Sequence, residues 1–177
     1  LGTGAPPASV GGHGLVPFDQ GPQAAISDFT NVTAIPGGPN GTSVGLSVAS
    51  SKRTVGGSWG TWSHGYTGAV YYPNGATTVT LNLPAGTEAF YVYAEPDPFS
   101  YQNITATSNT GATSGVISVT GASGANGFAF HSTAGEYITS ITITADTGFA
   151  IGEVGIGGEV FPAASCASEG YTGLKLE

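Results

Sequence analysis

A strict alternation of apolar and polar residues over residues 77–98 is the feature that most constrains this chain. Val79 and Leu81 alternate with threonine and asparagine, and after a Pro-Ala-Gly-Thr turn Phe90 and Val92 alternate with tyrosine. A two-residue period is typical of a strand with one buried face. The stretch therefore predicts an antiparallel hairpin with one face on a core and a partly aromatic outer face.

Similar short segments recur along most of the chain. They are β-branched or aromatic, are bounded by Gly, Pro, Asn, Ser or Asp, and are expected to be strands over residues 15–19, 26–33, 43–49, 69–72, 101–107, 115–120, 127–132, 137–145 and 149–157. No segment shows a helical period over ten residues. Ten or eleven strands with short turns predict an all-β, antiparallel two-sheet β-sandwich of jelly-roll type.

Composition divides the 177 residues into three parts. Residues 1–14 are rich in Gly, Pro and Ala and are expected to form an extended arm or linker. Residues 15–160 are expected to form the β-sandwich domain. Residues 161–177 lack the alternation and are expected to form a C-terminal tail.

Cys166 in this tail has no second cysteine to pair with in the chain. It is either an inert thiol or a point of attachment between molecules.

Charge and composition narrow the function classes. Only 8% of residues are charged and the net charge is −8, whereas nucleic-acid binding requires a basic face. No apolar run approaches the ~20 residues of a membrane span. A start at Leu1 fits a mature product whose leader has been removed. With its high Gly, Thr and Ser content, the chain is expected to be secreted and extracellular.

The last predicted strand contains a break in its alternation. Phe149 and Ile151 share one face, whereas Val154 and Ile156 fall on the other, so the phase slips by one residue at Glu153. A β-bulge produces such a slip. The bulge places Glu153 among apolar neighbours, where an unpaired carboxylate is costly, so we expect a partner that neutralises it.

Eleven acidic residues face only three basic ones, so Lys and Arg cannot pair with every buried carboxylate. Ca²⁺ takes oxygen ligands and is the natural alternative. The first and last strands of a jelly roll commonly lie close together, which makes Asp19, Asp28 and Glu153 one candidate cluster, with Glu95 and Asp97 as further candidate ligands. No linear calcium-loop motif is present, and backbone N–H and tyrosine hydroxyl groups are the alternative partners.

One dense aromatic cluster provides the candidate ligand-binding residues, which are Trp59, Trp62, His64, Tyr66, Tyr71 and Tyr72. Flat rings on loops above a sheet stack against the C–H faces of sugars, so the cluster predicts binding of a glycan or a cell-surface polymer. The alternative is a lid, in which the same side chains pack under a long loop onto the core.

No constellation predicts an enzyme. His13, His64 and His131 are far apart in the sequence, and no zinc motif or G-x-S-x-G elbow occurs. Glu95 and Asp97 lie two residues apart and point along a single loop, whereas a glycosidase pair must face each other across a sugar. We therefore expect a non-catalytic protein.

The stretches TWSHGYTGAVYYPNGATTVTLNLPAGTEAFYVYAEPDPF and GFAFHSTAGEYITSITITADTGFAIGEVGIG resemble a group of secreted bacterial β-sandwich proteins, many of which carry a PEP-CTERM-type sorting tail. In that group a Tyr-rich strand, an A-E-P-x-P-F loop and a final F-x-I-G-E-x-G-I strand recur in this order. The resemblance spans residues 58–157 and implies an extracellular jelly roll that is galactose-binding-like or carbohydrate-module-like. Its matched positions are Glu95, Pro96, Phe99 and Glu153, and it supplies no catalytic residues.

Two functions remain open from the sequence. The first is an extracellular, non-catalytic module that binds glycans or a surface through its aromatic loop end and is stabilised by calcium. The second is a self-assembling subunit of an extracellular filament or surface layer, in which residues 1–14 add to a neighbour's sheet edge. The clustered Trp and Tyr favour the first function, and the low charge and the apolar arm favour the second.

Overall fold

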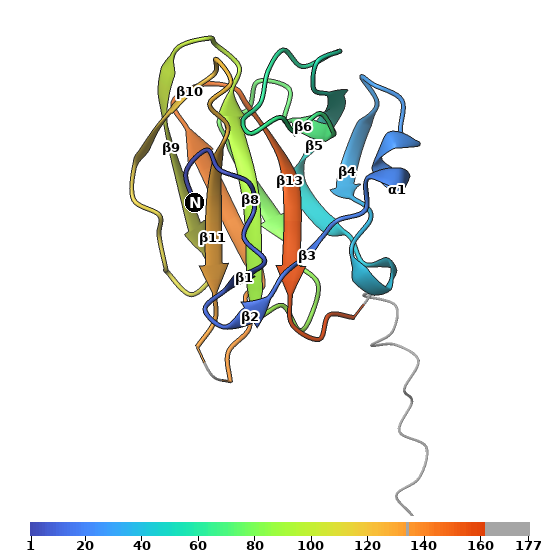
Figure 1. The fold of residues 1–177 in the computed structure, drawn as a ribbon, viewed down its shortest axis with the longest axis vertical. Coiled ribbons are helices and arrows are strands. Elements are labelled where there is room, and N and C mark those ends of the chain that lie inside the picture. The colour runs from blue at the N-terminus through green and yellow to red at the C-terminus, as the bar shows by residue number, and fades with distance from the viewer. Residues whose placement is uncertain (134, 162–177) are drawn as a thin grey trace, which may run out of the picture.

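The computed structural model describes residues 1–133 and 135–161, and Figure 1 shows its fold. Within these residues the strands are β1 (Ser9–Val10), β2 (His13–Gly14), β3 (Val16–Pro17), β4 (Asn31–Ile35), β5 (Val44–Thr54), β6 (Ala69–Tyr72), β7 (Thr78–Asn82), β8 (Ala89–Pro96), β9 (Tyr101–Ser108), β10 (Ile117–Thr120), β11 (Asn126–His131), β12 (Ser140–Ala145) and β13 (Phe149–Gly157). Two short helical segments accompany them, α1 (Gln20–Ala24) and the 3-10 turn η1 (Pro39–Gly41). None of the helices in the described residues has the length and apolar character that a membrane crossing requires.

Eleven of these strands form one antiparallel sheet that folds back on itself. Their order is β10-β9-β12-β7-β5-β6-β13-β8-β11, with β3 added to β13 and β4 to β5. The long strand β5 connects the two layers, because Gly45 and Leu46 pair with β7 whereas the stretch from Ser51 to Thr54 pairs with β6. The predicted all-β, antiparallel sandwich is confirmed.

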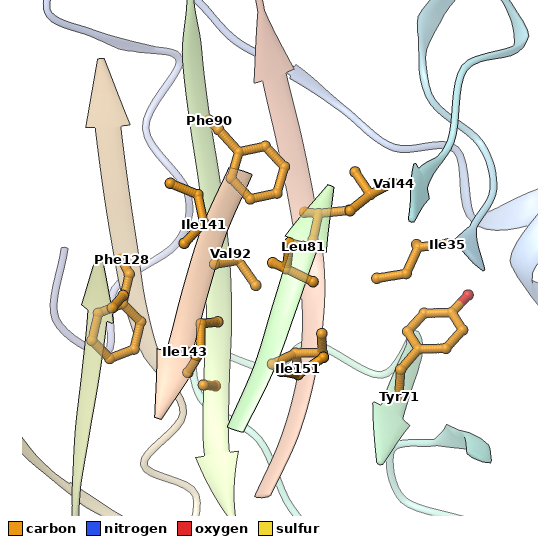
Figure 2. Packing of buried hydrophobic residues seen from close by; sticks show 14 of the residues in the cluster. Ile35, Val44, Tyr71, Leu81, Phe90, Val92, Phe128, Ile141, Ile143 and Ile151 are labelled. Atoms are coloured by element: carbon orange, nitrogen blue, oxygen red, sulfur yellow. The ribbon is translucent and has the colours of Figure 1, made fainter. Parts of the chain in front are cut away.

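Apolar side chains of the two layers meet between them and form the inner core. Figure 2 shows Ile141 and Leu81, from β12 and β7 of one layer, gathered with Phe90 and Val92, from β8 of the other layer. All four side chains are fully buried. Alternating residues of each strand supply this core, as the two-residue period predicts.

Residues 77–98 form two strands as predicted, but the hairpin is wrong. Strand β7 pairs with β12 and β5, whereas β8 pairs with β11 and β13. The turn after Pro84, held by a 2.7 Å hydrogen bond from the Thr87 hydroxyl to the Pro84 carbonyl, carries the chain from one layer to the other. Alternation shows which face of a strand is buried but not which strand lies beside it.

The outer face of β8 is aromatic, as predicted, but it is buried as well. Tyr91 and Tyr93 point to this side and are almost fully buried. They belong to a second cluster, the outer core, which consists of Val55, Trp59, Trp62, Val70, Tyr91, Tyr93, Ala125 and Ala150. The loop between β5 and β6 supplies both Trp rings and thereby covers this face.

The N-terminal arm lies against the sheet of its own chain, close to β8 and β11 (Figure 1). The Leu1 amine donates to the Gly127 carbonyl at 2.9 Å, and the Gly127 amide donates to the Gly2 carbonyl at 2.9 Å. The Tyr93 hydroxyl donates to the Gly4 carbonyl at 2.6 Å. The start of the arm therefore helps to close the outer core.

Two predicted strands near the N-terminus are wrong in part. Of residues 15–19, only Val16–Pro17 is a strand. Residues 26–33 follow α1 and begin as a loop, and strand β4 begins only at Asn31. Asp19 ends the extended segment because its side chain accepts a 2.9 Å hydrogen bond from the Gly21 amide and caps α1. Such an N-cap satisfies a free amide of the first turn and starts a helix.

The predicted β-bulge in β13 is confirmed. The register against β8 shifts between Gly152 and Gly155, and Glu153 adopts a left-handed backbone conformation with φ 50°. The extra residue returns the apolar side chains on both sides of it to the inner core. The Glu153 side chain is left on the outer side of the sheet, where the outer core forms.

Candidate functional site

A pocket of about 440 Å³ opens where the ends of β5, β6 and β8 meet. Its walls combine aromatic and polar side chains, namely Arg53, Ser58, Trp59, Thr61, Tyr72, Asp97 and Phe99. Strand ends supply Arg53 and Tyr72, and the β8–β9 turn supplies Asp97 and Phe99. Trp59 and its neighbours come from the loop between β5 and β6. Residues 53–61, Tyr72 and residues 96–99, which are separate in sequence, therefore converge on one concave site.

The two pocket rings with free surface are Phe99 and Tyr72. Phe99 is 70% exposed and lies against Gly60, where an added Cβ would stand only 3.0 Å from the ring. Tyr72 is half-buried, and its burial raises the pKa of its hydroxyl; the nearby Asp97 charge acts in the same direction and Arg53 opposes it. A neutral hydroxyl between opposite charges can both donate and accept hydrogen bonds.

Glu95 lies beneath the pocket and is fully buried. Its carboxylate accepts hydrogen bonds from Trp59 Nε1 at 3.0 Å, from the Gly124 amide at 3.1 Å and from the Thr61 hydroxyl at 3.2 Å. Burial raises the pKa of Glu95, and these hydrogen bonds act against that rise. The carboxylate thus connects the β5–β6 loop to the loop before β11 and fixes one wall of the pocket.

Glu153 has a comparable position under the other Trp. It accepts from Trp62 Nε1 at 3.2 Å and contacts His64 Nε2 at 2.7 Å, while His64 Nδ1 lies 3.1 Å from the Thr3 carbonyl oxygen. Burial raises the pKa of Glu153, and the His64 and Trp62 contacts lower it. The partner that the sequence predicts for Glu153 is therefore His64, with Trp62 beside it.

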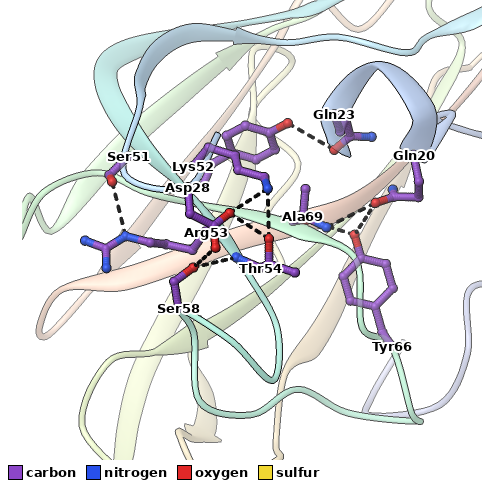
Figure 3. Close-up of polar contacts among 11 residues, drawn as sticks. Gln20, Gln23, Asp28, Ser51, Lys52, Arg53, Thr54, Ser58, Tyr66 and Ala69 are labelled. Atoms are coloured by element: carbon purple, nitrogen blue, oxygen red, sulfur yellow. Dashed lines mark hydrogen bonds and ion pairs between the residues drawn. The ribbon is translucent and has the colours of Figure 1, made fainter. Parts of the chain in front are cut away.

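Figure 3 shows a polar cluster around Asp28, and one member of this cluster, Ser58, also lines the pocket. Asp28 accepts from Lys52 Nζ at 2.6 Å and from the Thr54 hydroxyl at 2.7 Å, and the Ser58 hydroxyl donates to its second oxygen. Partial burial raises the pKa of Asp28, but the bonds from Lys52, Ser58 and Thr54 outweigh it and lower the pKa to about 2. Asp28 is therefore ionised at neutral pH and holds the Lys52 charge.

The structure places the five predicted calcium ligands in different surroundings. Asp19 caps α1, Asp28 binds Lys52, Glu153 contacts His64, Glu95 is enclosed by neutral donors, and Asp97 lines the pocket. Among residues 1–133 and 135–161, no three His, Cys, Asp or Glu side chains gather in a group that could hold a metal ion. Calcium binding stays a prediction. Cys166 lies outside the described residues.

The six predicted aromatic ligand residues do not share one exposed surface. Trp59 and Trp62 are buried in the outer core, Tyr71 reaches from the inner core to Gln23 at 3.1 Å, and the Tyr66 hydroxyl donates to the Ala69 carbonyl at 2.8 Å. His64 is engaged by Glu153.

Only Trp59 and Tyr72 of this set line the pocket. Sequence reasoning identified Phe99 only through the resemblance and did not identify Arg53. The one signal for Arg53 was the scarcity of basic residues in the chain.

No protein-family model and no curated protein sequence matches this chain. A solved structure that aligns with it is the carbohydrate-binding module TmCBM27, described for its specific recognition of mannan. The two share 14% sequence identity, the alignment covers 82% of this chain and 96% of that chain, and the TM-score is 0.29. The fold class therefore rests on the strand order, and the candidate site rests on its own geometry.

Proposed function

We propose that this chain is a non-catalytic module that binds glycans through the pocket between Tyr72 and Phe99. The observation that carries the proposal is the convergence of exposed aromatic surface with Arg53 and Asp97 on the ends of rigid strands. Aromatic rings contact the C–H faces of sugars, and a few placed polar groups select their hydroxyls. The β-sandwich holds these side chains without needing the ligand.

The carboxylates favour binding over hydrolysis. Asp97 is the only acidic side chain among the described residues that line the pocket. Glu95 lies nearby but is fully buried and surrounded by hydrogen-bond donors. Glycoside hydrolysis ordinarily needs two carboxyl groups that face each other across the sugar, so the pocket is suited to holding a sugar and not to cleaving it.

The position of the N-terminal arm favours a binding module over a self-assembling subunit. Leu1, Gly2 and Gly4 already contribute backbone groups to hydrogen bonds with their own sheet. Donation of the arm to a neighbour would require the loss of these bonds. The low charge and the high Gly, Thr and Ser content of the sequence support a working place outside the cell.

A glycan array followed by titration calorimetry tests the proposal. We expect Tyr72→Ala and Phe99→Ala each to weaken binding of an array ligand by about fivefold or more, because a central interface residue often contributes more than about 1 kcal/mol. Tyr137→Ala is a matched control, since Tyr137 is 54% exposed and is absent from the pocket lining. Absence of binding to the array, or an equal loss in the control, would contradict the proposal.

A further inference from the structure

Arg53 differs from the other basic side chains of this protein. Lys52 is neutralised by Asp28 at 2.6 Å, and Lys175 lies outside the described residues. Across residues 1–133 and 135–161, no carboxylate lies within ion-pair distance of the Arg53 guanidinium; the ion pairs involve His13, Lys52 and His64 instead. The described part of the chain therefore presents one arginine charge without an acidic partner, at the wall of the pocket.

The guanidinium is held in place by contacts that leave its ends available. Its Nε donates to the Ser51 hydroxyl at 3.1 Å, and its central carbon lies 4.2 Å from the centroid of the Phe29 ring and 5.8 Å from that of Tyr72. Figure 3 shows the guanidinium turned away from the Asp28 and Lys52 side chains, with its dashed line only from Nε. The terminal nitrogens thus remain available as a fork of donors.

Phe29 provides a second, independent observation. It is 64% exposed and has a φ of 69°, a left-handed backbone that is unusual and costly for a bulky residue. Its amide donates to the Lys52 carbonyl at 2.8 Å, which fixes the ring beside β5. An exposed phenyl ring on a strained backbone contributes little to a core, but it does cover one face of the Arg53 guanidinium.

We propose that the glycan taken by this pocket is acidic, and that Arg53 binds its anionic group through the two terminal nitrogens. This inference rests on the proposed function of the same pocket. A guanidinium fork matches a carboxylate with two parallel hydrogen bonds, and it also accepts a sulfate. The anionic group can therefore be the carboxylate of a uronic acid or a sulfate ester, while the rings of Tyr72 and Phe99 contact the sugar itself.

The charge of the remaining protein makes this recognition selective. The net charge is −8, and Asp97 lines the same pocket as Arg53, so general attraction cannot gather polyanions as a basic surface does. Only an anion that reaches the Arg53 fork gains a charge-assisted contact. Removing the acidic charge that lines the same pocket with Asp97→Asn should strengthen binding of an acidic glycan.

Two matched pairs of polymers test the inference, namely polygalacturonate with its methyl ester, and dextran sulfate with dextran. We expect one charged member to bind more tightly than its neutral partner, and Arg53→Gln to remove that preference with a loss of about tenfold or more. Arg53→Lys should restore only part of it, because the charge remains but the fork is lost. A preference in the first pair assigns a carboxylate, and one in the second pair assigns a sulfate.

Two outcomes separate this inference from the proposed function. Equal binding of charged and neutral partners in both pairs, unaffected by Arg53→Gln, overturns the inference while glycan binding stands. Absence of binding to any glycan, on the array as well, overturns both. If Arg53→Gln fails to fold, Phe29→Ala takes its place, since it keeps the charge but removes the stacked ring. We expect it to reduce the preference for the charged polymer, and an unchanged preference would count against the inference.

Discussion

The inner and outer cores, on opposite sides of β8 and β13, are built from different chemistry. The inner core is formed mainly by alternating apolar side chains of regular strands. The outer core is rich in Trp and Tyr and encloses two carboxylates, each of which accepts from an indole nitrogen: Glu95 from Trp59 and Glu153 from Trp62.

This difference follows from what covers each side of the sheet. A second layer of strands covers the inner face, so apolar burial alone orders it. The outer face is covered by the β5–β6 loop, which adds no strand to the sheet, and by the N-terminal arm, whose first residues form backbone hydrogen bonds with Gly127. Directional hydrogen bonds from Trp59 and Thr61 to Glu95, and from Trp62 to Glu153, hold the loop, which forms a wall of the pocket. The polar core is therefore the one that shapes the candidate site.

The largest expected loss of stability follows a substitution in the inner core. Phe90→Ala removes a fully buried ring and should lower the free energy of unfolding by about 3–5 kcal/mol, because lost burial and a cavity add together. Urea unfolding followed by Trp fluorescence measures this loss. Phe99→Ala is the matched control and should change stability by no more than about 0.5 kcal/mol, since its ring is exposed. A similar loss in both variants would break the distinction between core and pocket wall.

A smaller loss is expected when the outer core loses one carboxylate. Glu153→Gln keeps an acceptor oxygen but loses the carboxylate contact with His64 at 2.7 Å. Because burial raises the pKa of Glu153 and so disfavours its charged form, we expect a loss of about 0.5–1.5 kcal/mol, the net range for an ordinary hydrogen bond. The exposed Glu159→Gln serves as the control. We expect the same loss with calcium and with chelator, measured by thermal unfolding. A loss that appears only with calcium would instead support the predicted metal site.

The smallest expected effect is a change in how the free energy of unfolding depends on pH, and it comes from the carboxylates of the outer core. Burial raises the folded pKa of Glu95 above the ordinary 4.5, so its contribution to stability is full below that value and is lost as the pH rises through the folded pKa. Glu95→Gln should flatten this decline in unfolding free energy above pH 4.5. Glu153 shifts in the same direction, so Glu153→Gln provides the comparison.

The pKa of Asp28 shifts in the opposite direction from those of Glu95 and Glu153. Its pKa is lowered to about 2, so its contribution is lost only as the pH falls toward that value, and a titration above pH 4.5 separates the two glutamates from Asp28. An unchanged slope in Glu95→Gln would show that its burial does not control the pH response.

Local sequence pattern determined most of what is regular in this protein. The alternation of Val79 and Leu81, or of Phe90 and Val92, identified strands and their buried faces, because the two-residue period of a strand follows from its backbone alone. The phase slip at Glu153 located the bulge for the same reason. The strands over β6 and β13 were predicted with the bounds that the structure shows.

Only the tertiary structure decided which strands are neighbours and which polar groups meet. Strands β7 and β8 adjoin in sequence but lie in opposite layers, and Glu153 is 89 residues from His64. Arg53 stacks on Phe29 and lines a pocket with Phe99, although no local motif connects them. Such contacts depend on how the whole sheet folds over. The two-residue period of a strand shows which face is buried, but it does not show which distant segments the fold brings together.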